Sequence, residues 1–343
     1  MQRSGITLRV LGDHRPPTAI DRMLRRRPAE TRFDRCDFDG LDAVVGLVAT
    51  PLLDRLARTR PDIPFLHVTD ATPAFLRDAY GWAVPAEADA TEARVASAAA
   101  ACVFSSGLLA ARAPRDLGTP DMVALSQPFG VNLDQRPDRH PEKPPLQRLN
   151  LLFVGIDWVR KGGDVAVATL GLLRARGIDA QLTIVGRCPD RHLNHPAIQA
   201  AGFLNKNRPK DAALLSRLYT EAHLLVLPSR ADCTPMVIAE AMAHGTPVLA
   251  TDVGGIGTQV GGSGAGDLMA PYAPPEAWAD RIEDMTASQD RYNFLSDTAF
   301  DRAETRLNWA VWAERIETLV QQAVEVGRLP APERGAKVAL GAK

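Results

Sequence analysis

Short apolar runs alternate with longer amphipathic segments along most of the chain, a pattern typical of βα units built around a mainly parallel sheet. In the first half, the apolar runs predict strands at 6–12, 41–48, 64–70, 101–106 and 122–130, with a weaker candidate at 31–38. The amphipathic segments between them predict helices at 18–27, 51–60, 91–100 and 108–118.

A second alternating series begins at residue 149. It predicts strands at 149–155, 181–186, 223–229 and 246–251, helices at 163–177, 209–222 and 235–245, and a last amphipathic helix at 309–324. The segment 135–148 between the two series is proline-rich, charged and without periodicity, as a linker is. We therefore expect an α/β protein with two Rossmann-like domains, at 1–140 (joined by a helix at 308–325) and at 149–300.

Composition narrows the possible functions. The chain has 343 residues, enough for about two domains, and 45% of them are hydrophobic, enough for a sizeable core. The formal charge of −1 gives no overall attraction to nucleic acid or to an anionic membrane. The four cysteines form no pattern with metal-ligand spacing. No signal-peptide pattern and no membrane-length apolar run occurs, so we expect a cytoplasmic protein, at most peripheral to a membrane through 25–27.

Two carboxylates frame the start of the helix expected at 235–245. Asp232 lies in the loop before it, and Glu240 lies inside it. The amino end of a helix after a parallel strand attracts anions, and a carboxylate offers acceptors to both hydroxyls of a ribose. Together these features fit a nucleoside diphosphate. The alternative is that Asp232 caps the helix while Glu240 is solvated.

A basic pair precedes another helix. Arg160 and Lys161 follow a strand that ends in Gly155, and two glycines come directly after them. A planar guanidinium fork next to a lysine suits a diphosphate, although a solvated basic turn is also possible. The sequence contains neither a P-loop nor GxGxxG. Asp37 and Asp39 spell DxD, but they precede a predicted strand, so we interpret them as a solvated turn and expect no metal site.

In this order, "FVG", "RKGG", "IVG", "AGFL", "LPSR", the two acids and "EAMAHGTPVLAT" with "GGI" resemble the retaining GT-B glycosyltransferases of the family 4 type, also called group 1. The resemblance covers about 149–272. It implies two Rossmann-like domains facing each other across a cleft, with the last helix crossing back to the first domain. It further implies a hexosyltransferase that needs no cofactor and no metal, and that transfers a sugar from a UDP- or GDP-sugar to an acceptor hydroxyl.

The resemblance also implies roles for single residues. Glu240 would hold the ribose diol, Arg160 and Lys161 the diphosphate, and Asp232 the hydroxyls of the donor sugar. Other donor-binding positions would be Gly155, Arg187, Phe203, Thr234, Met236 and Val237, of which Arg187 and Phe203 would line the base pocket. UDP is favoured over GDP by the family alone.

Several departures from the family pattern leave alternatives open. The first acid is Asp232 instead of Glu, and Thr258 stands where Glu is usual. The family's His–Asp pair is replaced by Thr69 and Asp70, with His67 two positions earlier. Asp70 and His67 are therefore catalytic candidates together with Asp232 and Lys161, although His67 could equally be a core histidine. A nucleotide-sugar-binding partner subunit without transferase activity is the alternative function, and a sugar phosphorylase or epimerase is a third.

Overall fold

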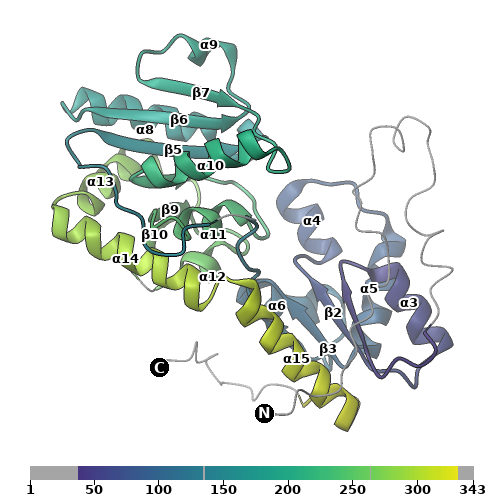
Figure 1. The fold of residues 1–343 in the computed structure, drawn as a ribbon. Helices are drawn as coiled ribbons and strands as arrows, with labels where there is room; N and C mark the ends of the chain where they lie inside the picture. Colours follow the sequence, from purple (N-terminus) through teal and green to yellow (C-terminus); the bar gives the residue numbers. More distant parts are fainter. Residues whose placement is uncertain (1–37, 134–135, 263, 331–343) are drawn as a thin grey trace.

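The computed structural model describes residues 38–133, 136–262 and 264–330. The strand expected at 6–12, the helix expected at 18–27, residues 25–27 and all but the last residue of the weak strand at 31–38 lie outside the described residues. In the described part, two parallel sheets lie side by side, each with helices on its faces (Figure 1).

The first sheet has the strand order β1-β2-β3-β4, and neighbouring strands are parallel. Its strands are β1 (Val44–Leu47), β2 (Phe65–Thr69), β3 (Ala101–Phe104) and β4 (Ala124–Ser126). Its helices are α3 (Thr50–Thr59), α4 (Pro73–Tyr80), α5 (Ala86–Ala98) and α6 (Gly107–Asp116). The four strands and three of the helices were predicted; α4 was not, because only eight residues separate Thr72, which caps it, from Gly81, which ends it.

The second sheet has the order β10-β9-β8-β5-β6-β7, again with parallel neighbours. Its strands are β5 (Leu149–Gly155), β6 (Ala180–Gly186), β7 (Ile198–Gly202), β8 (Leu224–Leu227), β9 (Val248–Thr251) and β10 (Gly266–Met269). Its helices are α7 (Trp158–Lys161), α8 (Gly163–Ala175), α9 (Asp190–Leu193), α10 (Pro209–Glu221), α11 (Met236–Met242), α12 (Ile256–Val260), α13 (Pro275–Met285) and α14 (Gln289–Thr305). The strand order changes direction at β5 and β8, and in open α/β sheets such a switch point is where ligands bind.

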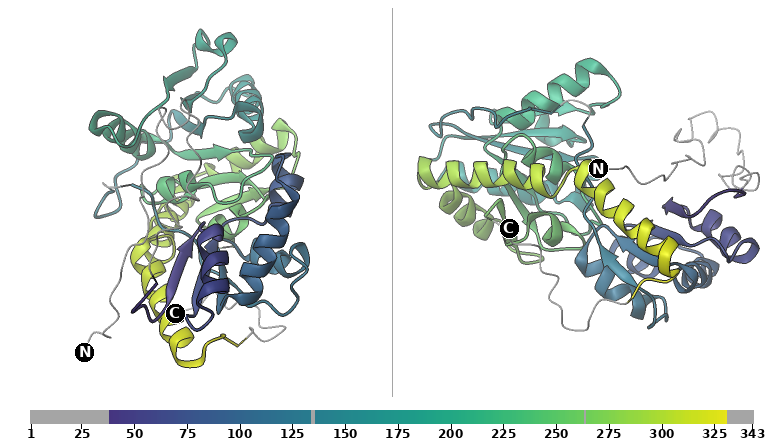
Figure 2. Two further views of the ribbon diagram at one scale, coloured as in Figure 1. Left: turned by 90° about the vertical axis from the view of Figure 1, so that its right-hand side faces the viewer. Right: turned by 60° about the horizontal axis from the view of Figure 1, so that its bottom comes forward.

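The last helix, α15 (Trp309–Val326), returns to the first domain (Figure 2). Ile316, Leu319 and Ala323 on this helix pack against Leu66 and Val68 of β2 in one buried cluster. This arrangement confirms the crossing helix that the family resemblance implied.

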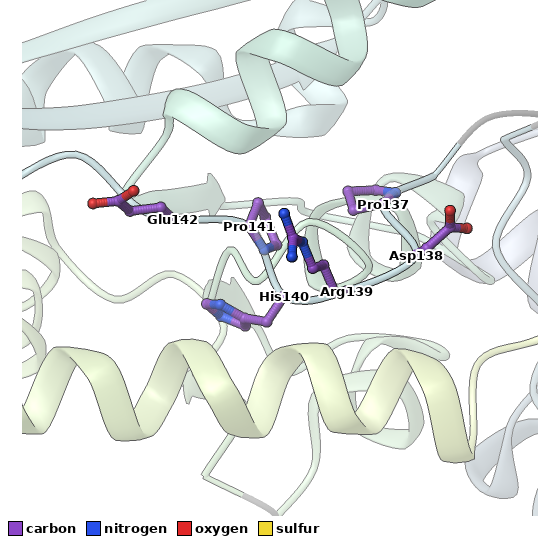
Figure 3. Close-up of a pocket in the computed structure, with 6 residues that line it drawn as sticks. All are labelled: Pro137, Asp138, Arg139, His140, Pro141 and Glu142. Atoms are coloured by element: carbon purple, nitrogen blue, oxygen red, sulfur yellow. The ribbon is translucent and has the colours of Figure 1, made fainter.

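The linker between the sheets is fixed to the second domain. Lys143 is half-buried and donates hydrogen bonds to the carbonyls of Tyr219, Thr220 and Ala222 at the end of α10. Figure 3 shows His140 directed toward α14, where its Nε2 lies 2.9 Å from Ser296 Oγ. The charged linker therefore contributes packing as well as a connection.

Candidate functional site

A short helix brings two cations to the loop that follows β8. Asp157 caps α7 by accepting a hydrogen bond from the Arg160 N–H at 3.1 Å. Gly162 then turns the chain with φ +75°, and a Cβ there would lie 2.0 Å from the Pro228 carbonyl oxygen. Only glycine permits this approach. Lys161 is thereby held beside the loop that carries Asp232.

Asp232 is the partner of both cations. Lys161 Nζ donates to its Oδ2, and Arg160 Nη1 lies 3.7 Å from the same oxygen while donating to the Ala231 carbonyl at 2.9 Å. The exposed fractions of the Lys161 and Asp232 side chains are 12% and 8%. Asp232 makes no side-chain cap at α11, whose N-cap is Pro235. Its carboxylate is therefore directed toward the basic pair, which the capping interpretation did not anticipate.

The backbone around Asp232 is set by the glycine pair of "GGI". Gly254 has φ +56°, and a Cβ there would lie 1.7 Å from the Asp232 carbonyl oxygen. The Gly255 N–H donates to that same oxygen at 3.2 Å. The loop after β9 thus packs directly against the loop after β8 and fixes the position of Asp232.

Asp70 approaches this loop from the first domain. It follows the last residue of β2, and burial raises the pKa of its carboxyl group, with a further increase from the negative charge of Asp232. Two acids from different domains therefore lie close enough to interact electrostatically. An acid with a raised pKa beside a charged partner is typical of functional sites.

Other contacts join the same edges of the two domains. The Tyr80 hydroxyl accepts a hydrogen bond from the Cys233 N–H at 2.8 Å, and the Arg160 guanidinium lies 5.1 Å from the centre of the Tyr80 ring. The hydroxyls of Ser105 and Thr234 are hydrogen-bonded to each other. The Gly107 N–H donates to Thr258 Oγ1 at 3.0 Å, so the residue that departs from the family pattern bridges the domains.

Glu240 is completely buried, not solvated. The Tyr219 hydroxyl donates to its Oε2 at 2.9 Å, and Lys206 Nζ donates to its Oε1. Burial and the nearby carboxylate raise the pKa of Tyr219 well above its usual value, so its phenol stays a donor. Sequence reasoning missed Lys206, for which the only signal was a basic residue shortly after "AGFL".

The remaining donor-site candidates lie at the same edge of the second sheet. Gly155 ends β5, the Arg187 N–H donates to its carbonyl oxygen at 3.2 Å, and the Phe203 side chain is 66% exposed just after β7. The side chains of the last two candidates are used for packing. Met236 packs on the cluster formed by β2 and α15, and Val237 packs on the core of the second domain.

His67 lies away from this group. Its side chain is 1% exposed, and its Nε2 lies 2.6 Å from Glu92 Oε1, which also accepts a hydrogen bond on Oε2 from the Thr50 hydroxyl at 2.8 Å. Since Thr50 begins α3 and Glu92 lies on α5, His67 belongs to the packing between β2 and these helices. The structure thus favours the core-histidine interpretation, and His67 does not join Asp70 and Asp232.

Three other expectations concern the DxD turn, a metal site and a membrane span. Asp39 pairs with Arg60, whereas Asp37 lies outside the described residues. Within 38–133, 136–262 and 264–330, no group of three or more His, Cys, Asp or Glu side chains is placed to hold a metal ion. Over the same residues, each helix is too short or too polar to cross a bilayer.

Comparison with known proteins gives a family-model match over part of the chain, and a fold. Residues 148–288 match the family model of the glycosyl transferases group 1. D-inositol 3-phosphate glycosyltransferases are similar in sequence. The one from Paenarthrobacter aurescens is 35% identical over 144 residues (40% of this chain, 35% of that protein), and the one from Corynebacterium aurimucosum is 27% identical over 229 residues (61% and 53%). The matches thus span about a third to a half of these relatives.

Solved structures share the fold at low sequence identity. A sucrose-phosphate synthase from Thermosynechococcus elongatus superposes with a TM-score of 0.65 at 21% identity, over 83% of this chain and 74% of that one. HepE of Anabaena, solved with UDP and glucose, superposes with a TM-score of 0.57 at 14% identity, over 90% and 83%. The expected GT-B fold is confirmed.

Proposed function

Because residues 148–288 match the family model of the glycosyl transferases group 1, we propose that this chain transfers a sugar from a nucleotide-sugar donor to an acceptor hydroxyl. The observation that carries the proposal is the convergence of Lys161, Arg160 and Asp232 at the edge of the second sheet, with Asp70 of the first domain near enough for the charge of Asp232 to raise its pKa. Glu240 lies buried about one and a half turns into the helix that follows.

The donor would lie along the edge of the second sheet. Glu240 would accept hydrogen bonds from the two ribose hydroxyls, and the exposed Phe203 ring and Arg187 would flank the base. Lys161 and Arg160 would contact the diphosphate, with Asp232 against the sugar hydroxyls. UDP and GDP are the donor bases that we propose to test, UDP first.

The proposed mechanism of sugar transfer follows from where charge develops as the donor is cleaved. As the bond from the anomeric carbon to the diphosphate oxygen breaks, negative charge grows on the phosphate and positive charge on the sugar. Cations already in place stabilise that phosphate without a metal ion, and each well-directed donor contributes about 3–4 kcal/mol. The acceptor hydroxyl attacks from the same face and passes its proton to the departing phosphate, so the anomeric configuration is retained.

Asp70 would act on the acceptor side. Its raised pKa, caused first by burial, gives a carboxylate that accepts a hydrogen bond readily. In that position it would orient the attacking hydroxyl toward the sugar held by Asp232.

The proposal is tested by a screen of nucleotide sugars for turnover by the purified chain, preceded by melting curves with UDP and GDP. Saturating ligand at ~100 times its dissociation constant adds ~2.7 kcal/mol, which is readily measured. Release of nucleoside diphosphate with sugar transferred to an acceptor supports the proposal. Nucleotide binding without transfer or donor hydrolysis would instead favour a nucleotide-sugar-binding partner subunit.

A further inference from the structure

Lys206 lies in a well-fixed loop between β7 and α10. The Asn205 N–H donates to Asp211 Oδ2 at 3.0 Å, and the Asn207 N–H donates to Asn205 Oδ1 at 3.0 Å. The Arg208 N–H closes the turn on the Asn205 carbonyl at 2.8 Å. The backbone on both sides of Lys206 is therefore held in place, while its side chain is 34% exposed and reaches Glu240.

The two partners of Glu240 differ in how easily they can leave. Tyr219 is fully buried on α10 and part of the hydrophobic core of the second domain, so its hydroxyl has no other position to adopt. Lys206 has a long flexible stem and lies at the surface. Only Lys206 can withdraw into solvent without disturbing the core.

Lys206 acts as the counterion of the Glu240 carboxylate. The carboxylate is completely buried, and a buried ionised group is strongly unfavourable unless it is paired and hydrogen-bonded. Lys206 is the cation that pairs with it, and Tyr219 satisfies the other oxygen. Hydroxyls of a bound ribose would require the oxygen that Lys206 occupies.

We propose that Lys206 is a displaceable counterion of Glu240, which leaves the carboxylate when the ribose of the donor binds and returns when the nucleotide departs. This inference rests on the proposed function, since it assumes that Glu240 receives the ribose. The lysine then lowers the apparent affinity for nucleotide in proportion to the fraction of chains in which Glu240 is free. It also keeps the buried acid paired between turnovers.

The test compares Lys206→Met and Lys206→Gln with the parent chain, using UDP and GDP in calorimetric titrations and in melting curves. Lys210→Met, on the exposed first turn of α10, is the matched control. If about one chain in ten has Glu240 free, removing Lys206 tightens the dissociation constant by about tenfold. The melting temperature without nucleotide falls in both Lys206 variants, and the increase caused by nucleotide becomes larger than in the parent.

Each other outcome overturns the inference. An unchanged dissociation constant would show that Lys206 does not compete with the nucleotide. A weaker one would make Lys206 a direct ligand of the donor, and either result would leave the proposed function intact. If neither nucleotide binds to the parent chain or to the variants, the proposed function fails together with the counterion exchange.

Discussion

Replacing Lys161 with Met separates the catalytic and structural roles of the basic pair. Lys161 and Asp232 are 12% and 8% exposed, so the pair is largely shielded from water. Removing one partner of a buried pair costs about 3–5 kcal/mol when nothing replaces it. Here Arg160 remains 3.7 Å from Asp232, so we expect the smaller loss of about 1–2 kcal/mol in the free energy of unfolding.

The effect on turnover should be much larger. A cation directed at the leaving phosphate contributes about 3–4 kcal/mol to the transition state, so kcat should fall by about 10²–10³. Chemical denaturation measures the stability, and release of nucleoside diphosphate from the donor measures kcat. Lys210→Met provides the control for loss of a lysine.

A double-mutant cycle with Asp232→Asn completes this test. The double variant should regain most of the stability lost in Lys161→Met, because no unpaired carboxylate remains, but none of the turnover. If Lys161→Met kept kcat within about threefold of the parent chain, the lysine would be structural only and the assignment to the diphosphate would be refuted.

Two further predictions concern stability. Lys143→Met should lower the free energy of unfolding by about 2–4 kcal/mol, because it removes the lysine that donates to the Thr220 and Ala222 carbonyl oxygens, while Thr246 Oγ1 still donates to the Tyr219 carbonyl; a loss below about 1 kcal/mol in urea titrations would contradict this. Burial lowers the pKa of His244 from 6.5 to about 4, so between these pH values the unfolded chain binds a proton that the folded chain does not. Stability should therefore fall as the pH drops through this window, by about 3 kcal/mol from this residue, and His244→Gln should show a correspondingly shallower fall in urea titrations from pH 7 to 4. Equal slopes for the two chains would show that His244 is not the residue responsible.

In the second domain, strands β5, β6, β8 and β9 were predictable because they are continuous apolar runs, and helices α8, α10 and α11 were predictable from their spacing and end signals. Strands β7 and β10 were missed, because β7 is largely exposed and β10 is a short, half-buried edge strand. Helix α14 was missed for a specific reason. Its buried positions are Tyr292, Ser296, Ala299 and Ala303, which have helical spacing but include only one large apolar side chain. A pattern based on hydrophobic residues cannot detect such a helix, whose burial depends on close approach to α11 and α13 instead.

The candidate site was predictable where residue types alone set the chemistry. Asp232, Lys161 and Glu240 carry charges next to glycine turns or helix starts, and the structure pairs the first two directly. The partner of Glu240 could not be predicted, because Lys206 lies 34 positions away in a loop whose conformation depends on Asn205. The surroundings of His67 likewise depended on which face of β2 it occupies, because Glu92 on α5 lies against that face.

The most direct test of the account is a crystal structure of the chain with whichever of UDP or GDP raises its melting temperature. The account predicts that both ribose hydroxyls lie within hydrogen-bond distance of the Glu240 carboxylate and that the diphosphate contacts Lys161 and Arg160. A nucleotide bound elsewhere on the chain, with Lys161 still on Asp232 and Lys206 still on Glu240, would contradict it.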